Sequence, residues 1–159
     1  MRELEYLLES INSLCKSLNY DYSINSGGCC YLSAIIAKHL DRLGIDYDLV
    51  IYDDSTKRIN DIRNEIFKHQ VIDEITSSVI GEYTCHHYCL RIGRYGIIND
   101  TSRKGDYKYI ISNVSSKNIR WIYKNGDWNQ WYDVKNNRTI RNKVNKFFKE
   151  YEKTSSLQS

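Results

Sequence analysis

The chain has 159 residues, of which 41% are hydrophobic and 27% charged, a composition that predicts a folded domain and excludes a disordered chain. The formal net charge of +3 is too small to indicate a nucleic-acid-binding protein by itself. No stretch approaches the roughly 18 apolar residues of a membrane span, and no signal peptide is recognisable. The five cysteines favour free thiols in a reducing compartment. We therefore expect a cytoplasmic protein without a membrane partner. Lys, Asn, Ile and Tyr are abundant, which is typical of an AT-rich genome such as that of a virus or phage, and the location would then be the host cytoplasm.

The first elements expected in chain order are two helices. Apolar residues recur at spacings of three and four over residues 2–18, which predicts an amphipathic helix. The turn-rich segment 19–28 predicts a loop. A second amphipathic helix is predicted from Cys29 to Leu43, because Gly44 follows the last apolar residue as a helix C-terminal cap does.

Strands and an inserted helical region are expected next. Residues 46–52 are rich in β-branched and aromatic side chains and predict a short strand. The segment 56–80 predicts one or two helices, broken near His69–Val71 and inserted before the next strand. Residues 88–92 and 97–98 predict two strands joined by a turn.

The last third of the chain predicts more strands and a final helix. Residues 107–111 predict a strand. Residues 119–123 and 128–132 flank Asn125–Gly126, a dipeptide that favours a hairpin between two strands. Residues 139–151 predict a basic amphipathic helix. The order of the elements indicates an α+β fold.

The candidate chemistry begins at Cys29. The segment Ser26–Gly28 provides a sharp turn, and Cys29 then opens the second helix. The positive end of a helix dipole favours the thiolate, which is the reactive form of cysteine. Cys29 lies on the helix face of Leu32 and Ile36, so we expect it to point inward, toward the sheet.

A thiol nucleophile needs a base, and the base is usually histidine. We expect His87, at the start of a predicted strand, to face Cys29. His86 remains an alternative because the two histidines are adjacent. A third group should orient the ring, and the next predicted strand ends in Asn99 and Asp100, either of which is a candidate.

These residues resemble a family. The segment Ser26–Cys29, the apolar helix after it and Leu43–Ile45 are similar to the nucleophile helix of papain-like thiol enzymes, transglutaminase-like ones especially. The segments His87–Gly93 and 97–101 are similar to the family's histidine strand and acid strand. The resemblance covers about residues 26–102. It implies a single domain over the whole chain, in which the nucleophile helix packs on a small antiparallel sheet.

The resemblance also implies an activity. Cys29 would attack a carbonyl and form a thioester, which would then be hydrolysed or transferred to an amine. The enzyme would be a peptidase, an amidase or deamidase, or a transglutaminase that acts on a protein or peptide, without a cofactor or metal. The backbone N–H of Cys29 would form half of an oxyanion hole, with Asn25 as a second donor. The catalytic residues would be Cys29 and His87 with Asp100 or Asn99.

Other interpretations stay open. Cys29 can be a structural core cysteine, and the chain can be a non-catalytic binding or inhibitor module, a viral one included, on the same scaffold. The segment Cys85–Cys89 clusters possible zinc ligands, which Cys29 and Cys30 would complete. The late aromatic residues and the basic helix over 139–151 can together bind nucleic acid. The sequence predicts neither the substrate nor the oligomeric state.

Overall fold

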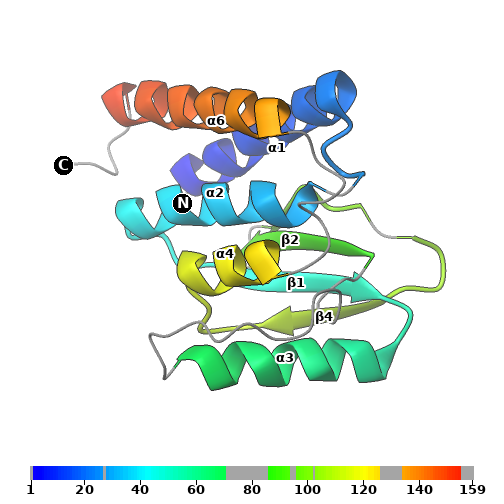
Figure 1. Cartoon of the computed structure of the whole chain (residues 1–159). Helices are drawn as coiled ribbons and strands as arrows, with labels where there is room; N and C mark the ends of the chain where they lie inside the picture. Colours follow the sequence, from blue (N-terminus) through cyan, green and yellow to red (C-terminus); the bar gives the residue numbers. More distant parts are fainter. Residues whose placement is uncertain are drawn as a thin grey trace.

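The computed structural model describes residues 2–26, 28–70, 86–93, 96–101, 103–125 and 134–154. These residues form an α+β fold, as the sequence predicts, with helices around one antiparallel four-stranded sheet (Figure 1). The helices are α1 (Arg2–Tyr22), α2 (Cys29–Leu43), α3 (Thr56–Gln70), α4 (Ser116–Asn125) and α6 (Val134–Thr154).

The sheet has the strand order β3-β2-β1-β4, and every neighbouring pair is antiparallel. The strands are β1 (Asp48–Asp53), β2 (His87–Ile92), β3 (Gly96–Ile98) and β4 (Tyr107–Ile111). Among the described residues, β3 pairs only with Leu90–Ile92 of β2. In the described part of the chain, the first half of β2 therefore has no strand beside it on that edge. The segments that carry Cys29, His87 and Asn99 meet there, at the end of β3.

The second helix begins and ends where the sequence predicts. Leu32, Ile36 and Leu40 are buried along one stripe of α2. Gly44 adopts the left-handed region at φ 71°, which glycine reaches without the steric cost that a Cβ brings. The N–H of Ile45 donates to the carbonyl of Leu40 at 3.0 Å, as in a typical helix C-terminal cap.

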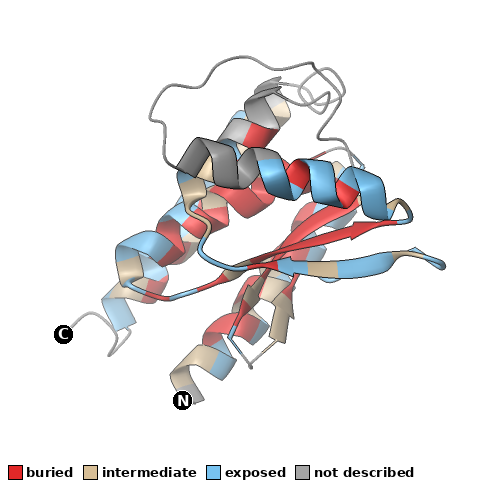
Figure 2. Ribbon diagram, turned by 90° about the horizontal axis from the view of Figure 1, so that it is seen from below, coloured by how far each residue is buried: buried red, intermediate tan, exposed pale blue. Residues whose placement is uncertain are grey.

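The helices cover the sheet unequally. α2 lies between the sheet and α6, whereas α1 neighbours α6 and packs directly on β3, and α3 lies beyond β4 (Figure 1). The buried residues lie on the strands and on the inward faces of the helices, whereas the outward face of α3 is exposed (Figure 2). The prediction that the helix of Cys29 packs on a small antiparallel sheet is confirmed.

Side chains of β1 and β2 alternate between two faces of the sheet. The face that joins the main core with α1, α2, α4 and α6 carries Leu49, Ile51, Tyr88 and Leu90. The other face holds a smaller cluster of Val50, Tyr52 and Cys89. Because His87 lies opposite Tyr52 in the strand pairing, its side chain belongs to this second face.

The prediction of a strand over 119–123 is wrong, because these residues belong to α4. Ser115 Oγ accepts the N–H of Asn118 at 3.3 Å, and Asn118 Oδ1 accepts the N–H of Ser115 at 2.8 Å. This reciprocal pair caps the start of the helix. Ile119 and Ile122 are both fully buried and share one face at helical spacing. The cap and this spacing outweigh the hairpin signal that follows them.

Other predictions differ in extent. α6 confirms the basic helix and is longer than predicted, and α3 confirms a helix at the start of the segment 56–80. The rest of that segment, and the second predicted hairpin strand over 128–132, lie outside the described residues. The aromatic hairpin was one of two parts of the nucleic-acid interpretation. Because residues 119–123 are helical, the predicted aromatic hairpin does not form, and only the basic residues of α6 still support nucleic-acid binding.

A ring stack and polar contacts join α6 to α2, the helix that begins at Cys29. The ring of His39 on α2 stacks on Phe148 of α6, with centroids 4.4 Å apart. Arg42 donates to His39 Nδ1 at 3.1 Å, so Nε2 must carry the hydrogen that it donates to Asn145 Oδ1 at 2.8 Å. Arg42 also pairs with Glu152. His39 is therefore held as a neutral ring.

This contact predicts a pH dependence of stability. Burial lowers the pKa of His39 from its ordinary 6.5, so the unfolded chain takes up a proton that the folded chain resists. The stabilisation is complete above about pH 6.5 and is lost as the pH falls through that value, with a slope of at most about 1.4 kcal/mol per pH unit. We expect the urea unfolding free energy of His39→Gln to fall less than that of the wild type between about pH 7.5 and about pH 5.5. Equal slopes would contradict this account of His39.

Candidate active site

Cys29 is the first residue of α2, and its side chain is buried in the main core, 2% exposed. Its Sγ accepts the backbone N–H of Tyr88 at 3.5 Å. Burial raises the pKa of Cys29, and the N–H of Tyr88 lowers it only in part. The helix N-terminus therefore does not produce the resting thiolate that the sequence led us to expect, because desolvation outweighs it.

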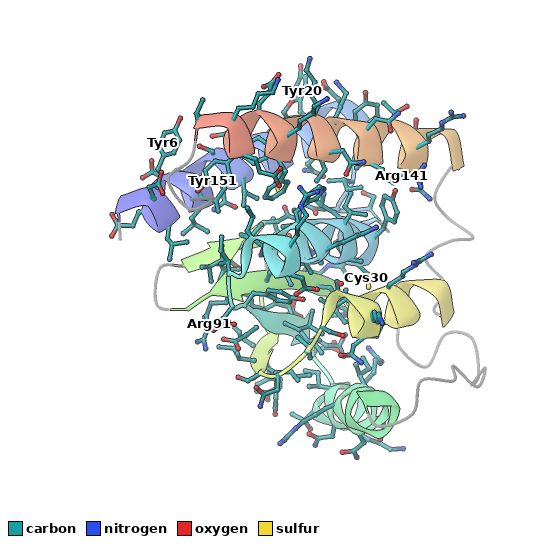
Figure 3. All side chains as sticks on the ribbon, turned by 90° about the vertical axis from the view of Figure 1, so that its left-hand side faces the viewer. Tyr6, Tyr20, Cys30, Arg91, Arg141 and Tyr151 are labelled. Atoms are coloured by element: carbon teal, nitrogen blue, oxygen red, sulfur yellow. The ribbon has the colours of Figure 1, made fainter. Side chains whose placement is uncertain are left out.

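Cys30 serves a separate contact. Its Sγ donates to the backbone carbonyl of Ile119 on α4 at 3.7 Å, and Figure 3 shows it between α2 and α4. The two adjacent cysteines thus point in different directions, as their positions on a helix predict. Cys30 belongs to the packing of α4 on α2.

His87 is the first residue of β2 and is 3% exposed. Its Nε2 lies 2.7 Å from the backbone carbonyl of Asn99 and 3.1 Å from Thr101 Oγ1. A carbonyl oxygen only accepts, so Nε2 carries the hydrogen and Nδ1 carries the lone pair of the neutral ring. Burial lowers the pKa of His87, so the ring is neutral at pH 7.

The structure brings the segments of Cys29 and His87 together, but the two side chains approach from different faces of the sheet. The sulfur belongs to the core beneath α2, whereas the His87 ring stacks with Tyr52 on the second face, with centroids 6.2 Å apart. Among the described residues, no hydrogen bond joins the sulfur to the ring. Their link is the backbone of β2 at the end of β3, where Tyr88 N–H reaches the sulfur.

Asp100 acts on His87 from a distance. Its Oδ1 accepts the hydroxyl of Tyr52 at 2.5 Å rather than a hydrogen from the imidazole. Burial, and then Asp100, raise the pKa of Tyr52, so the phenol stays protonated and keeps donating. Asp100 also raises the pKa of His87, against the larger effect of burial. The carboxylate therefore favours a positive charge on the ring without touching it.

Asn99 orients His87 through its main chain and not through its side chain. Its amide forms a reciprocal pair with Asn25, in which Asn99 Nδ2 donates at 2.8 Å and Asn25 Nδ2 donates at 3.2 Å. The Asn25 amide, considered from the sequence as an oxyanion donor, is thus engaged with Asn99. The group that orients His87 is therefore the backbone carbonyl of Asn99, which a pattern of side chains in the sequence cannot predict.

His86 leads away from Cys29, toward β4. Its Nδ1 lies 2.6 Å from Asp106 Oδ1, and its backbone N–H donates to Asp53 Oδ1 at 3.1 Å. Asp53, Asp54 and His86 have potential metal-ligand atoms within 4.8 Å of one another. The oxygens of Asp53, however, already accept Arg58 Nη1 at 3.0 and 2.9 Å, besides two backbone N–H groups. The cluster of Asp53, Asp54 and His86 is therefore part of a network of ion pairs and hydrogen bonds beside the start of β2.

The predicted zinc ligands do not converge where the structure describes them. His86 and His87 direct their rings to Asp106 and to Asn99, on different sides of β2. Cys29 and Cys30 also diverge. Cys85 lies outside the described residues.

Sequence reasoning missed Asn12, Tyr52 and Thr101. Asn12 is a half-buried polar residue of α1 directly after the buried Ile11, a position where an amide side chain usually has a structural partner. Tyr52 could be found only with the strand register, which pairs it with His87. Thr101 is the last residue of the segment that resembles the acid strand, so the sequence pointed to its position but not to its contact with His87.

Comparisons with models of protein families, with curated proteins and with solved structures found no match to this chain. The likeness to papain-like and transglutaminase-like enzymes therefore rests on the motifs of the sequence. Among the described helices, none is sufficiently long and apolar to cross a membrane.

Proposed function

We propose that the protein is a cysteine-dependent hydrolase or acyl transferase of the papain-like or transglutaminase-like kind, with Cys29 as nucleophile and His87 as base. The observation that carries this proposal is the hydrogen bond from Tyr88 N–H to Cys29 Sγ, which holds the start of α2 against the residue after His87. The bond from Nε2–H of His87 to Asn99 leaves Nδ1 as the proton acceptor. Asp100 favours the imidazolium that forms.

The reaction would begin with neutral groups. As Sγ of Cys29 bonds to the substrate carbonyl carbon, its proton moves to Nδ1 of His87, and the carbonyl oxygen becomes an oxyanion. The N-cap of α2 is Gly28, which places no side-chain cap over the first-turn N–H groups, and the N–H of Cys29 is our candidate donor to that oxyanion. His87 then returns the proton to the leaving amine, and a thioester remains. Water or an amine then attacks the thioester carbonyl and gives its proton to His87, which passes that proton to the departing sulfur of Cys29 as the acid or amide is released.

This mechanism requires a rearrangement on substrate binding. Cys29 is almost fully buried, and the His87 ring faces the other side of β2. Productive contact needs the sulfur and Nδ1 to meet at the end of β3. Burial also keeps the resting thiol protonated, and an unreactive resting thiol would be protected from oxidation.

The substrate we propose is a protein or peptide, cleaved, deamidated or cross-linked through an acyl-enzyme. We propose a cytoplasmic location, since the described cysteines Cys15, Cys29 and Cys89 are free thiols.

Hydrolysis of a panel of acyl donors tests the proposal. The panel comprises p-nitrophenyl acetate, an alkyl thioester and a glutamine-containing peptide, each given to the wild type, Cys29→Ala and Cys15→Ala. We expect turnover of at least one donor by the wild type and Cys15→Ala, and none above background by Cys29→Ala. Cys15 is the matched control because it is another buried thiol, on α1, and burial raises its pKa to about 12. Equal turnover by all three proteins would refute the proposal.

The burial of Cys29 also favours a second candidate, a binding or inhibitor module in which this cysteine only packs. Cys29→Ala would then retain the biological effect of the protein. The loss of that effect in a folded Cys29→Ala protein would exclude this candidate.

A further inference from the structure

Amide side chains from three separate segments meet around Asn99. Asn12 comes from the middle of α1, Asn25 from the loop before α2, and Asn99 follows β3. Each is at least half-buried. Four hydrogen bonds join them to one another and to Ile97, so the first helix and the loop before Cys29 are tied to the turn that faces His87.

Asn12 uses both ends of its amide. Its Oδ1 accepts the backbone N–H of Asn99 at 2.7 Å, and its Nδ2 donates to the carbonyl of Ile97 at 3.2 Å. These two backbone groups lie at the end of β3, where no residue of the described strands pairs with Asn99. Bonding both groups requires a side chain that donates one hydrogen bond and accepts another. An alkyl group can do neither, and a carboxylate can only accept from the N–H of Asn99.

The conformation of Asn99 requires this support. Its φ of 63° lies in the left-handed region, which residues with a Cβ adopt at a steric cost and which asparagine adopts more readily than most. Asn12 holds its backbone N–H, and Asn25 holds its side-chain amide. The conformation so fixed directs the carbonyl of Asn99 to Nε2 of His87 at 2.7 Å.

We infer that Asn12 and Asn25 are positioning residues for His87: through Asn99 they hold the ring with its Nε2–H on a carbonyl, so that Nδ1 is the basic nitrogen. The hydrogen-bond part of this inference is independent of the enzymatic proposal. The meaning of Nδ1 as a catalytic base rests on the proposed function.

NMR of the protein labelled with ¹⁵N-histidine tests the inference without any substrate. In the wild type, we expect a slowly exchanging Nε2–H proton on His87 and a protonation midpoint below the ordinary 6.5. In Asn12→Leu and in Asn25→Ala, the Asn99 carbonyl should turn away. The Nε2–H proton should then exchange faster, and the midpoint should move lower still, because this bond raises the pKa of His87.

Asn118→Ala is the matched control, since it removes an amide that caps α4, away from the site. It should leave the His87 signals unchanged. Thermal unfolding establishes that each variant is folded, and Asn25→Ala, in a loop, serves if Asn12→Leu does not fold. Unchanged His87 exchange and titration in a folded variant would overturn the inference, as would a wild-type ring protonated at Nδ1. A shifted His87 in a protein without acyl transfer would preserve the inference and remove only the proposed function.

Discussion

Replacing His87 by glutamine should lower the rate of acylation at Cys29 by about 100- to 10,000-fold, the usual contribution of a general base. A glutamine amide can still donate to the carbonyl of Asn99, but it cannot take a proton from the thiol. The wild-type rate should fall as the pH drops through the lowered pKa of His87, because the protonated ring is no base. This acidic limb should disappear in His87→Gln. Stopped-flow acylation by p-nitrophenyl acetate across the pH range measures both effects.

His86→Gln is the matched control for that experiment. His86 is the adjacent histidine, and its ring contacts Asp106 instead of the end of β3. We expect its acylation rate to stay within a few-fold of the wild type, by the ordinary range for a group outside the reaction. A large loss in His86→Gln together with a normal rate in His87→Gln would assign the base to His86.

Phe148→Ala should cost about 3–5 kcal/mol of stability, the range for removing a buried aromatic side chain. Phe148 is fully buried between α6 and α2, and its ring stacks on His39. Because a domain has only about 5–15 kcal/mol of total stability, the loss should bring the protein close to unfolding. Urea unfolding at pH 7.5 or so, where His39 is neutral, measures the change.

Phe147→Ala is the control for this prediction. Its ring meets Phe148 edge-on, with centroids 5.1 Å apart, but the side chain is only half-buried. We expect a loss well below that of Phe148→Ala. A cost under about 1 kcal/mol for Phe148→Ala would show that α6 does not depend on this contact.

The sequence predicted the elements whose signals agree with one another. The apolar stripe of α2, its start after Gly28 and the glycine at position 44 all indicate one helix, and its bounds are confirmed. The four strands of the sheet are each within two residues of their predicted starts. Strand pairing could not be predicted, because the order β3-β2-β1-β4 depends on contacts between segments far apart in the chain.

Signals that compete locally gave the errors. Residues 119–123 contain β-branched and aromatic side chains before an Asn-Gly pair, and they were predicted as a strand for that reason. The sequence also contains Ser115 and Asn118, whose reciprocal cap favours a helix over the strand. Here a capping pattern was more informative than residue propensity.

The site was predictable at the level of segments but not of atoms. Cys29 lies against the backbone of β2 at Tyr88, but the ring of His87 does not face its sulfur as expected. The face that His87 occupies depends on the register with Tyr52, and the orienting group is a carbonyl that every residue possesses. The protonation of Cys29 also followed from burial, which the position at a helix N-terminus does not reveal.

Acid-quenched mass spectrometry of the protein after brief reaction with p-nitrophenyl acetate tests the central claim most directly. We predict one acetyl group per chain, located on Cys29 by peptide fragmentation, in the wild type and in Cys15→Ala. Acetylation spread over several residues, or an equal amount in Cys29→Ala, would contradict the assignment of Cys29 as the nucleophile.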